Sequence, residues 1–280
     1  TRFDFMGTNK KSLIIVSAVI IVCISSFAIR GLSQSIDFTG GRNFKVQFEN
    51  PVEPEQVREL IASKFGDANV SVIAIGTDKK TVRISTNYRI EDAGNNVDSE
   101  IESYLYETLK PVLTQNISLE TFIDRDNHTG GSIVSSQKVG PSIADDIKTG
   151  AIYSVVLALL AIGLYILLRF RNIAYSIGSI VALSCDTIMI IGAYSLFWGI
   201  LPFSLEIDQT FIGAILTAIG YSINDKVVIF DRVREFFGLY PKRDKRQLFN
   251  DSLNTTLART INTSLSTLIV LLCIFILGGD

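Results

Sequence analysis

The residue with the clearest potential for chemistry is Asp225, which lies beside Lys226 in a segment otherwise apolar enough to sit in lipid. An ionisable side chain at membrane depth is costly and is by default a functional-site hypothesis. Away from water a carboxyl group favours its neutral form, unless a cation lies near it. A carboxylate held between these two tendencies can bind and release a proton, so the segment predicts a proton-transfer site.

Polar side chains recur near Asp225 at helical spacing and are expected to share one face of its helix. A second stripe, of small residues, would let a neighbouring helix approach closely, and plain packing is its simpler reading. The polar face contains Thr210, Thr217, Tyr221 and Asn224, and the small stripe contains Ala214, Ala218 and Ser222.

Two cations could neutralise Asp225. Lys226 is adjacent in sequence and points about 100° away around a helix, so it is a poor direct partner. Arg259 begins a polar stripe in the last apolar run, and a polar stripe in lipid must face protein or water. We expect this stripe to bring Arg259 near Asp225, as a proton relay or as a static ion pair that stabilises the bundle. The stripe contains Arg259, Asn262, Thr263, Ser266 and Thr267.

Asp186 is the only charged residue in residues 172–205. Two roles are open for it: membership of the same interior cluster, or a hydrogen bond to helix backbone. The candidate proton relay therefore comprises Asp225, Arg259 and Asp186.

These residues need transmembrane helices to position them. Of the 280 residues 48% are hydrophobic and 19% charged, which indicates a membrane protein with a soluble insert. An uncharged run of 18 or more residues can span a bilayer. The first run exceeds the apolar core of a signal peptide, and Arg30 follows it where a cleavage site would need small residues. The five predicted spans lie at 12–29, 149–168, 172–205, 209–230 and 260–279.

The distribution of Lys and Arg gives an orientation. The N-terminus and residues 232–259 are basic, whereas the connection at about 199–208 contains no Lys or Arg. The positive-inside rule then places the basic segments in the cytoplasm. The predicted organisation is a cytoplasmic N-terminus at 1–11, a first helix at 12–30, an extracytoplasmic domain at 31–146, and helices two to five at 147–280, with a basic cytoplasmic loop near 232–259. A sixth helix is expected to follow Asp280.

Residues 31–146 combine alternating strands with amphipathic helices. The expected order is strand, helix, strand, strand, helix, strand, which indicates a ferredoxin-like α+β fold. The expected strands are 43–49, 70–75, 81–86, 117–123 and 132–139, and the expected helices are 54–65 and 97–109. Residues 76–80 provide a hairpin turn between the second and third strands.

Glycine and proline mark both ends of this domain. Gly40 and Gly41 permit a tight turn into the first strand, although a ligand-binding loop is the alternative. Gly140 and Pro141 break the chain before the second span.

Several classes of function are disfavoured. Cys23, Cys185 and Cys273 all lie in apolar runs, and His128 is the only histidine, so we expect no disulfide framework, no metal site and no His-based triad. We find no nucleophile–base pair or phosphate-binding loop, which makes an enzyme the least expected class and predicts no cofactor. The net charge of −2 gives no general attraction to nucleic acid.

Four motifs resemble the SecF family of protein translocase subunits, or the SecF half of fused SecDF proteins, in the resistance–nodulation–division superfamily. They are Asp37-Phe-Thr-Gly-Gly41, Val139-Gly-Pro141, Gly220-Tyr-Ser-Ile-Asn-Asp-Lys-Val-Val-Ile-Phe-Asp-Arg-Val-Arg234 and Ser252-Leu-Asn-Thr-Thr-Leu-Ala-Arg-Thr260. The resemblance implies six helices, with Asp225 and Arg259 at the positions implicated in proton passage. Cys185 stands where the family often has histidine, which weakens a proton role at Asp186.

The resemblance also implies a function: a subunit of the bacterial cytoplasmic (inner) membrane that uses the proton gradient to assist preprotein export. The implied partners are SecD, separate or fused, the Sec translocon channel, its motor ATPase and preprotein substrates. Two alternatives are a small-molecule efflux component of the same superfamily and a membrane assembly factor without proton coupling. An efflux component would favour an outer region larger than residues 31–146.

Overall fold

The computed structural model describes residues 3–65, 70–76, 78–92, 96–114, 117–126, 131–201 and 205–277. The chain forms two compact units. We call the first the membrane unit; it comprises Thr1–Leu32, Ile152–Ile200 and Thr210–Gly278. We call the second the sheet unit; it comprises Ser33–Ala151 and Leu201–Gln209.

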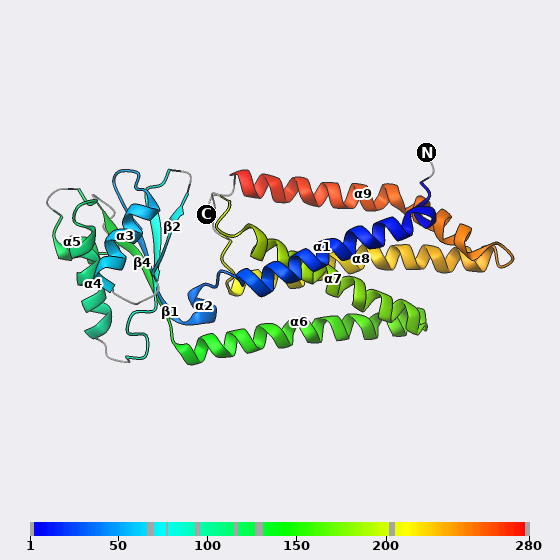
Figure 1. Ribbon diagram of the computed structural model, residues 1–280, viewed down its shortest axis with the longest axis horizontal. Helices are drawn as coiled ribbons and strands as arrows, with labels where there is room; N and C mark the ends of the chain where they lie inside the picture. The colour runs from blue at the N-terminus through cyan, green and yellow to red at the C-terminus, as the bar shows by residue number, and fades with distance from the viewer. Residues whose placement is uncertain are drawn as a thin grey trace. The chain divides into compact units, whose positions relative to one another are not determined.

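Long helices make up the membrane unit (Figure 1). Within the described residues, five helices are long and apolar enough to cross a membrane, which confirms the expected number of spans. They are α1 (Phe5–Arg30), α6 (Pro141–Phe170), α7 (Ile173–Phe197), α8 (Gln209–Leu239) and α9 (Lys245–Leu277). Their surfaces expose many large apolar side chains, as expected for helices that face lipid.

Small residues hold α1 against α7. A Cβ atom built on Gly192 of α7 would lie 2.2 Å from the Cβ atom of Cys23, so only glycine fits there. One turn further along, the buried hydroxyls of Ser26 and Ser195 hydrogen-bond each other at 3.1 Å. Close approach at small residues is a common way for transmembrane helices to associate, because lipid offers no hydrophobic driving force between them.

The start of α1 is bound to α9. The side-chain Oδ1 of Asn250 accepts hydrogen bonds from the backbone N–H groups of Phe5 and Met6, at 2.8 and 3.3 Å. Asn254 Oδ1 accepts from the N–H of Phe3 at 2.8 Å. The first N–H groups of a helix have no partner inside the helix, so these amides complete the N-terminal turn of α1.

The sheet unit contains a four-stranded antiparallel sheet in the order β2-β3-β1-β4. With the helices between the strands this is the expected ferredoxin-like topology, and Figure 1 shows α3 and α4 on one face of the sheet. The elements are α2 (Ile36–Thr39), β1 (Gly41–Gln47), α3 (Pro54–Phe65), β2 (Val70–Ile75), β3 (Thr81–Thr86), α4 (Asn96–Leu109), α5 (Leu119–Ile123) and β4 (Ser132–Val139). Thr77, inside the expected hairpin turn, lies outside the described residues.

The core follows from two periodicities. Alternate residues of β1 and β3, such as Phe44 and Ile84, point to one face, and residues three or four apart on α3 and α4 point back at them. Phe44 and Ile84 are fully buried, as are Ile61 of α3 and Leu105 of α4. Burying one such side chain contributes about 1.5–3 kcal/mol, so this layer dominates the stability of the unit.

The expected strand at 117–123 was wrong. Residues Leu119–Ile123 form the short helix α5. The Ser118 hydroxyl caps it by accepting from the N–H of Thr121 at 3.2 Å. Phe122 is fully buried against the core. A helical turn places this one ring in the core, and the local cap decides against the strand.

The two glycine motifs meet at the junction of α2, β1 and α6. Gly40 has φ +72°, and a Cβ atom there would lie 3.3 Å from the Cα atom of Pro141. Gly41 has φ +152°, and its Cβ atom would lie 2.9 Å from the carbonyl oxygen of Thr86. Pro141 is the first residue of α6, where its missing N–H costs nothing. No atom lies within 4 Å of a Cβ atom on Gly140.

Candidate proton-transfer site

The charged residues of the membrane unit meet between α7 and α8. Asp186 Oδ2 accepts hydrogen bonds from Lys226 Nζ and from Ser222 Oγ, each at 2.6 Å. Lys226 Nζ also donates to Ser222 Oγ at 2.5 Å. The side chains of Lys226 and Asp186 are 21% and 33% exposed. Asp186 therefore pairs across the two helices with Lys226 and Ser222, and no described contact joins it to Asp225 or Arg259.

Asp225 is next to Lys226 in sequence but outside this cluster. It is half-buried, and it forms no hydrogen bond or ion pair with any other residue that the structure describes. Lys226 pairs with Asp186, so Asp225 has no cationic partner among the residues that the structure describes.

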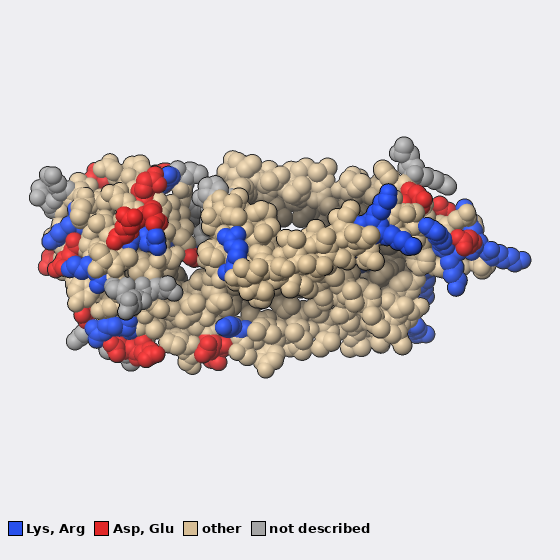
Figure 2. Space-filling model, viewed as in Figure 1, with Lys and Arg blue, Asp and Glu red and all other residues tan. Residues whose placement is uncertain are grey.

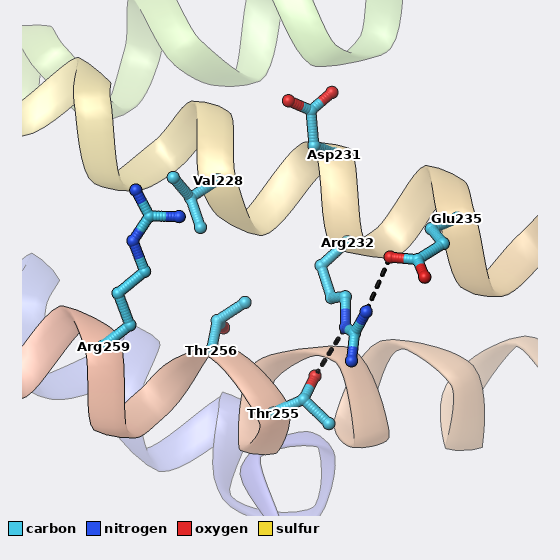
Figure 3. Close-up of a pocket in the computed structure, with 7 residues that line it drawn as sticks. All are labelled: Val228, Asp231, Arg232, Glu235, Thr255, Thr256 and Arg259. Carbon is cyan, nitrogen blue, oxygen red and sulfur yellow. Dashed lines mark hydrogen bonds and ion pairs between the residues drawn. The ribbon is translucent and has the colours of Figure 1, made fainter.

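Arg259 reaches toward α8 from α9, but it does not pair with Asp225. Its guanidinium points at α8 beside Val228, in a surface pocket that Asp231 and Arg232 also line (Figure 3). No described carboxylate lies within 4.0 Å of it. The expected close approach of Arg259 to Asp225 is therefore not an ion pair in this conformation.

Neighbouring charges in the pocket are already paired. Arg232 donates to Glu235 Oε2 at 2.7 Å and to Thr255 Oγ1 at 3.2 Å (Figure 3). Asp231 forms an ion pair with Arg169 at 3.2 Å. Arg259 thus remains the cation of this pocket that is not neutralised by a described carboxylate.

The supporting polar residues are only partly brought together. The Tyr221 hydroxyl hydrogen-bonds the Thr267 hydroxyl and approaches the Thr263 carbonyl at 3.4 Å, which joins α8 to α9. Thr217 donates to the carbonyl of Gly213 in its own helix at 2.7 Å. Asn224 and Asn262 are exposed on the isolated chain. The polar face of α8 therefore contacts the stripe on α9 through Tyr221.

Sequence reasoning named Lys226 and Ser222 but missed that they are the partners of Asp186. They are four residues apart, so they share a face of α8. The available signal was Asp186, a lone carboxylate in an apolar span that needs a cation or hydroxyl partner. Among the described residues, no group of three or more His, Cys, Asp or Glu side chains could hold a metal ion.

Comparison with known proteins identifies the family. The family described as "Protein export membrane protein SecD/SecF, C-terminal" matches residues 120–280, and the "SecD/SecF GG Motif" family matches residues 25–52. The protein translocase subunit SecF of Rhodothermus marinus is 36% identical over 279 residues, covering 100% of this chain and 83% of that protein. The chain belongs to the SecF family.

Other SecF and SecDF proteins agree with this assignment. SecF of Haemophilus influenzae is 29% identical over 276 residues, covering 99% of this chain and 76% of that protein. The crystal structure of SecDF from Thermus thermophilus, a translocon-associated membrane protein, matches with a TM-score of 0.78 and 28% identity. The match covers 100% of this chain and 34% of the SecDF chain. SecF membership and five membrane-capable helices make the chain a multi-pass membrane protein, and they support an accessory role in Sec protein export.

Proposed function

We propose that the chain is a proton-motive-force-driven accessory subunit of the Sec machinery, which assists preprotein translocation across the bacterial cytoplasmic membrane. SecD is its partner, as the fused SecDF relative suggests. The translocon channel, the motor ATPase and the preprotein are further partners in this proposal. The observation that supports the coupling is the half-buried Asp225 carboxyl group, which pairs with no described cation although Lys226 is its neighbour in sequence.

The proposed cycle uses two protonation states of Asp225. When neutral, the side chain tolerates the apolar interior of the bundle; when charged, it favours water or a cation. Arg259 is the nearby cation in this proposal, because its guanidinium faces α8 from the next helix. A gradient moves the cycle only if the conformations differ in proton affinity. An Arg259 that approaches Asp225 in one conformation and leaves it in another provides that difference.

The proposed orientation rests on the basic end of the membrane unit. Figure 2 shows Lys and Arg gathered where α8 is followed by α9. They include Arg232, Arg234, Lys242, Arg243, Lys245 and Arg246. The start of α1 binds Asn250 at this same end. The positive-inside rule assigns it to the cytoplasm, and the domain that follows the other end of α1 is then extracytoplasmic.

The test is proton flux in sealed vesicles that contain the full-length protein together with SecD. Asp225→Asn is expected to lower the flux driven by a proton gradient at least tenfold, because the amide cannot bind and release the proton. Asp231→Asn is the matched control, since Asp231 lies on the same helix and is paired with Arg169. Equal flux in the parent and in Asp225→Asn would refute the relay.

A further inference from the structure

The five residues before and at the start of α8, 205–209, belong to the sheet unit and are bound to its other segments. We call this segment the strap. Ile207 forms a parallel β-bridge with Gln34: its N–H donates to the Ser33 carbonyl at 2.8 Å, and its carbonyl accepts from the N–H of Ser35 at 3.0 Å. The Ile207 side chain is buried. The strap therefore has its own backbone pairing and its own apolar anchor.

A largely buried ion pair attaches the strap to the sheet. Glu206 Oε2 accepts from Arg83 of β3 at 2.8 Å, and Glu206 Oε1 accepts from the Ser71 hydroxyl of β2 at 3.1 Å. The Glu206 and Arg83 side chains are 10% and 27% exposed. Hydrogen bonds to charged partners are about twice as strong as neutral ones. Glu206 thus binds two adjacent strands at once.

The third attachment involves the first glycine motif. Asp37 Oδ2, three residues before Gly40, accepts from the N–H of Gln209 at 3.0 Å. Gln209 is the first residue of α8. A carboxylate at a helix N-terminus satisfies an otherwise unpaired N–H and stabilises the helix dipole. Asp37 therefore fixes the position of the α8 N-terminus relative to α2 and β1.

We propose that the strap is the mechanical link of the export cycle, with Asp37, Arg83 and Glu206 as positioning residues that make the start of α8 move with the sheet unit. This inference rests on the proposed function. Asp225 lies on the same continuous helix, 16 residues after Gln209, or about 24 Å along the helix axis. A helix keeps its length when it moves, so a displacement of α8 along its axis at Asp225 also displaces the strap at its N-terminal end. The attachments then pass it to the sheet.

Charge reversal separates this link from a purely structural role. In the full-length protein paired with SecD, Arg83→Glu and Glu206→Arg are each expected to lower preprotein export into vesicles at least fivefold. Asp225-dependent proton flux is expected to stay within twofold of the parent, because the relay itself is untouched. The double variant Arg83→Glu/Glu206→Arg restores the pair with opposite polarity and is expected to recover export to within twofold.

An exposed ion pair of the same unit provides the control. Lys64 and Glu107 lie 2.9 Å apart, and reversing either is expected to leave export unchanged. Single reversals of Arg83 or Glu206 that keep export within twofold would overturn the link. The link would also be overturned if export and proton flux both fell and the double variant did not recover them. That result would show that the Arg83–Glu206 pair only stabilises the fold.

Hydrogen exchange distinguishes failure of the link from failure of the proposed function. Asp225→Asn mimics the protonated state and is expected to change exchange at the Ser35 and Ile207 amides at least threefold. The change should disappear in Arg83→Glu. If Asp225→Asn alone left exchange at the Ser35 and Ile207 amides unchanged, the link would be overturned. Proton flux that does not depend on Asp225 would instead refute the proposed function.

Discussion

Lys226 Nζ on α8 lies 2.6 Å from Asp186 Oδ2 on α7. Lys226 therefore pairs with a carboxylate 40 residues earlier in the chain, and not with Asp225 beside it. Two adjacent residues of one helix therefore differ in their contacts: Lys226 pairs α8 with α7, and Asp225 forms no ion pair or hydrogen bond with another described residue.

Replacing Lys226 by Met is expected to destabilise the membrane unit by about 2 kcal/mol, because Asp186 would be left without its cation. The value is below the roughly 3–5 kcal/mol for a fully buried pair, since both side chains keep some exposure. Thermal unfolding in detergent measures the loss. The double variant Asp186→Asn/Lys226→Met removes both charges and is expected to recover more than half of it; an equal or larger loss would contradict the pairing.

Much of the fold follows from residue patterns. Long apolar runs predicted all five spans, because a membrane helix satisfies its backbone hydrogen bonds internally, whatever its neighbours. The alternation of Phe44 and Val46 predicted β1 because one face of the sheet is buried. The strand expected at 117–123 failed because Ser118 provides a helix cap, a contact that apolar spacing does not reveal.

The site was less predictable than the fold. Asp225 and Asp186 could both be predicted as site residues, because burying a charged side chain in lipid costs free energy. The partner of Asp186 could not be deduced, since helix order and rotation decide which faces of α7 and α8 meet. Arg259 was expected to meet Asp225, but the rotation of α9 aims its guanidinium at Val228.

Gly192→Leu is expected to force α1 away from α7, because even a Cβ atom would lie 2.2 Å from that of Cys23. Cys23 is only 6% exposed, so separation of the helices makes it reactive. Maleimide labelling in a Cys185→Ser/Cys273→Ser background is expected to rise at least fivefold. Gly178→Leu, on the same helix with no atom within 4 Å of its Cβ position, is expected to leave labelling unchanged. Equal labelling in both variants would contradict the close contact.

Gly41→Ala is expected to destabilise the sheet unit by more than about 1 kcal/mol. Its φ of +152° is unfavourable for alanine, and the new methyl group would lie 2.8 Å from Ile36 and 2.9 Å from the Thr86 carbonyl. Hydrogen exchange of the β1 and β3 amides measures the effect. Gly140→Ala, in the second motif, has open space around it and is expected to change exchange little. Comparable effects at the two positions would show that steric contact at Gly41 is not the cause.

Glu102→Gln is expected to stabilise the sheet unit at neutral pH. Burial raises the pKa of the Glu102 carboxyl, and the nearby Arg125 opposes this only in part. A carboxyl group whose folded pKa is raised contributes stability at low pH that is lost as the pH rises above its unfolded pKa of about 4.3. The gain in amide protection of α4 on substitution should therefore be larger at pH 7 than at pH 4. A gain that does not depend on pH would argue against a titrating Glu102.

The binding of the α1 N-terminus to Asn250 has a consequence for the order of biosynthesis. The two partners, Phe5 and Asn250, are 245 positions apart. At about 5–20 residues per second, the ribosome makes Asn250 roughly 12–50 s after Phe5. The first helix therefore enters the bilayer long before the amide that completes its first turn exists, and only a chain elongated past Asn250 can close that turn. A nascent chain arrested before α9 would leave the Phe5 and Met6 amides without their Asn250 partner.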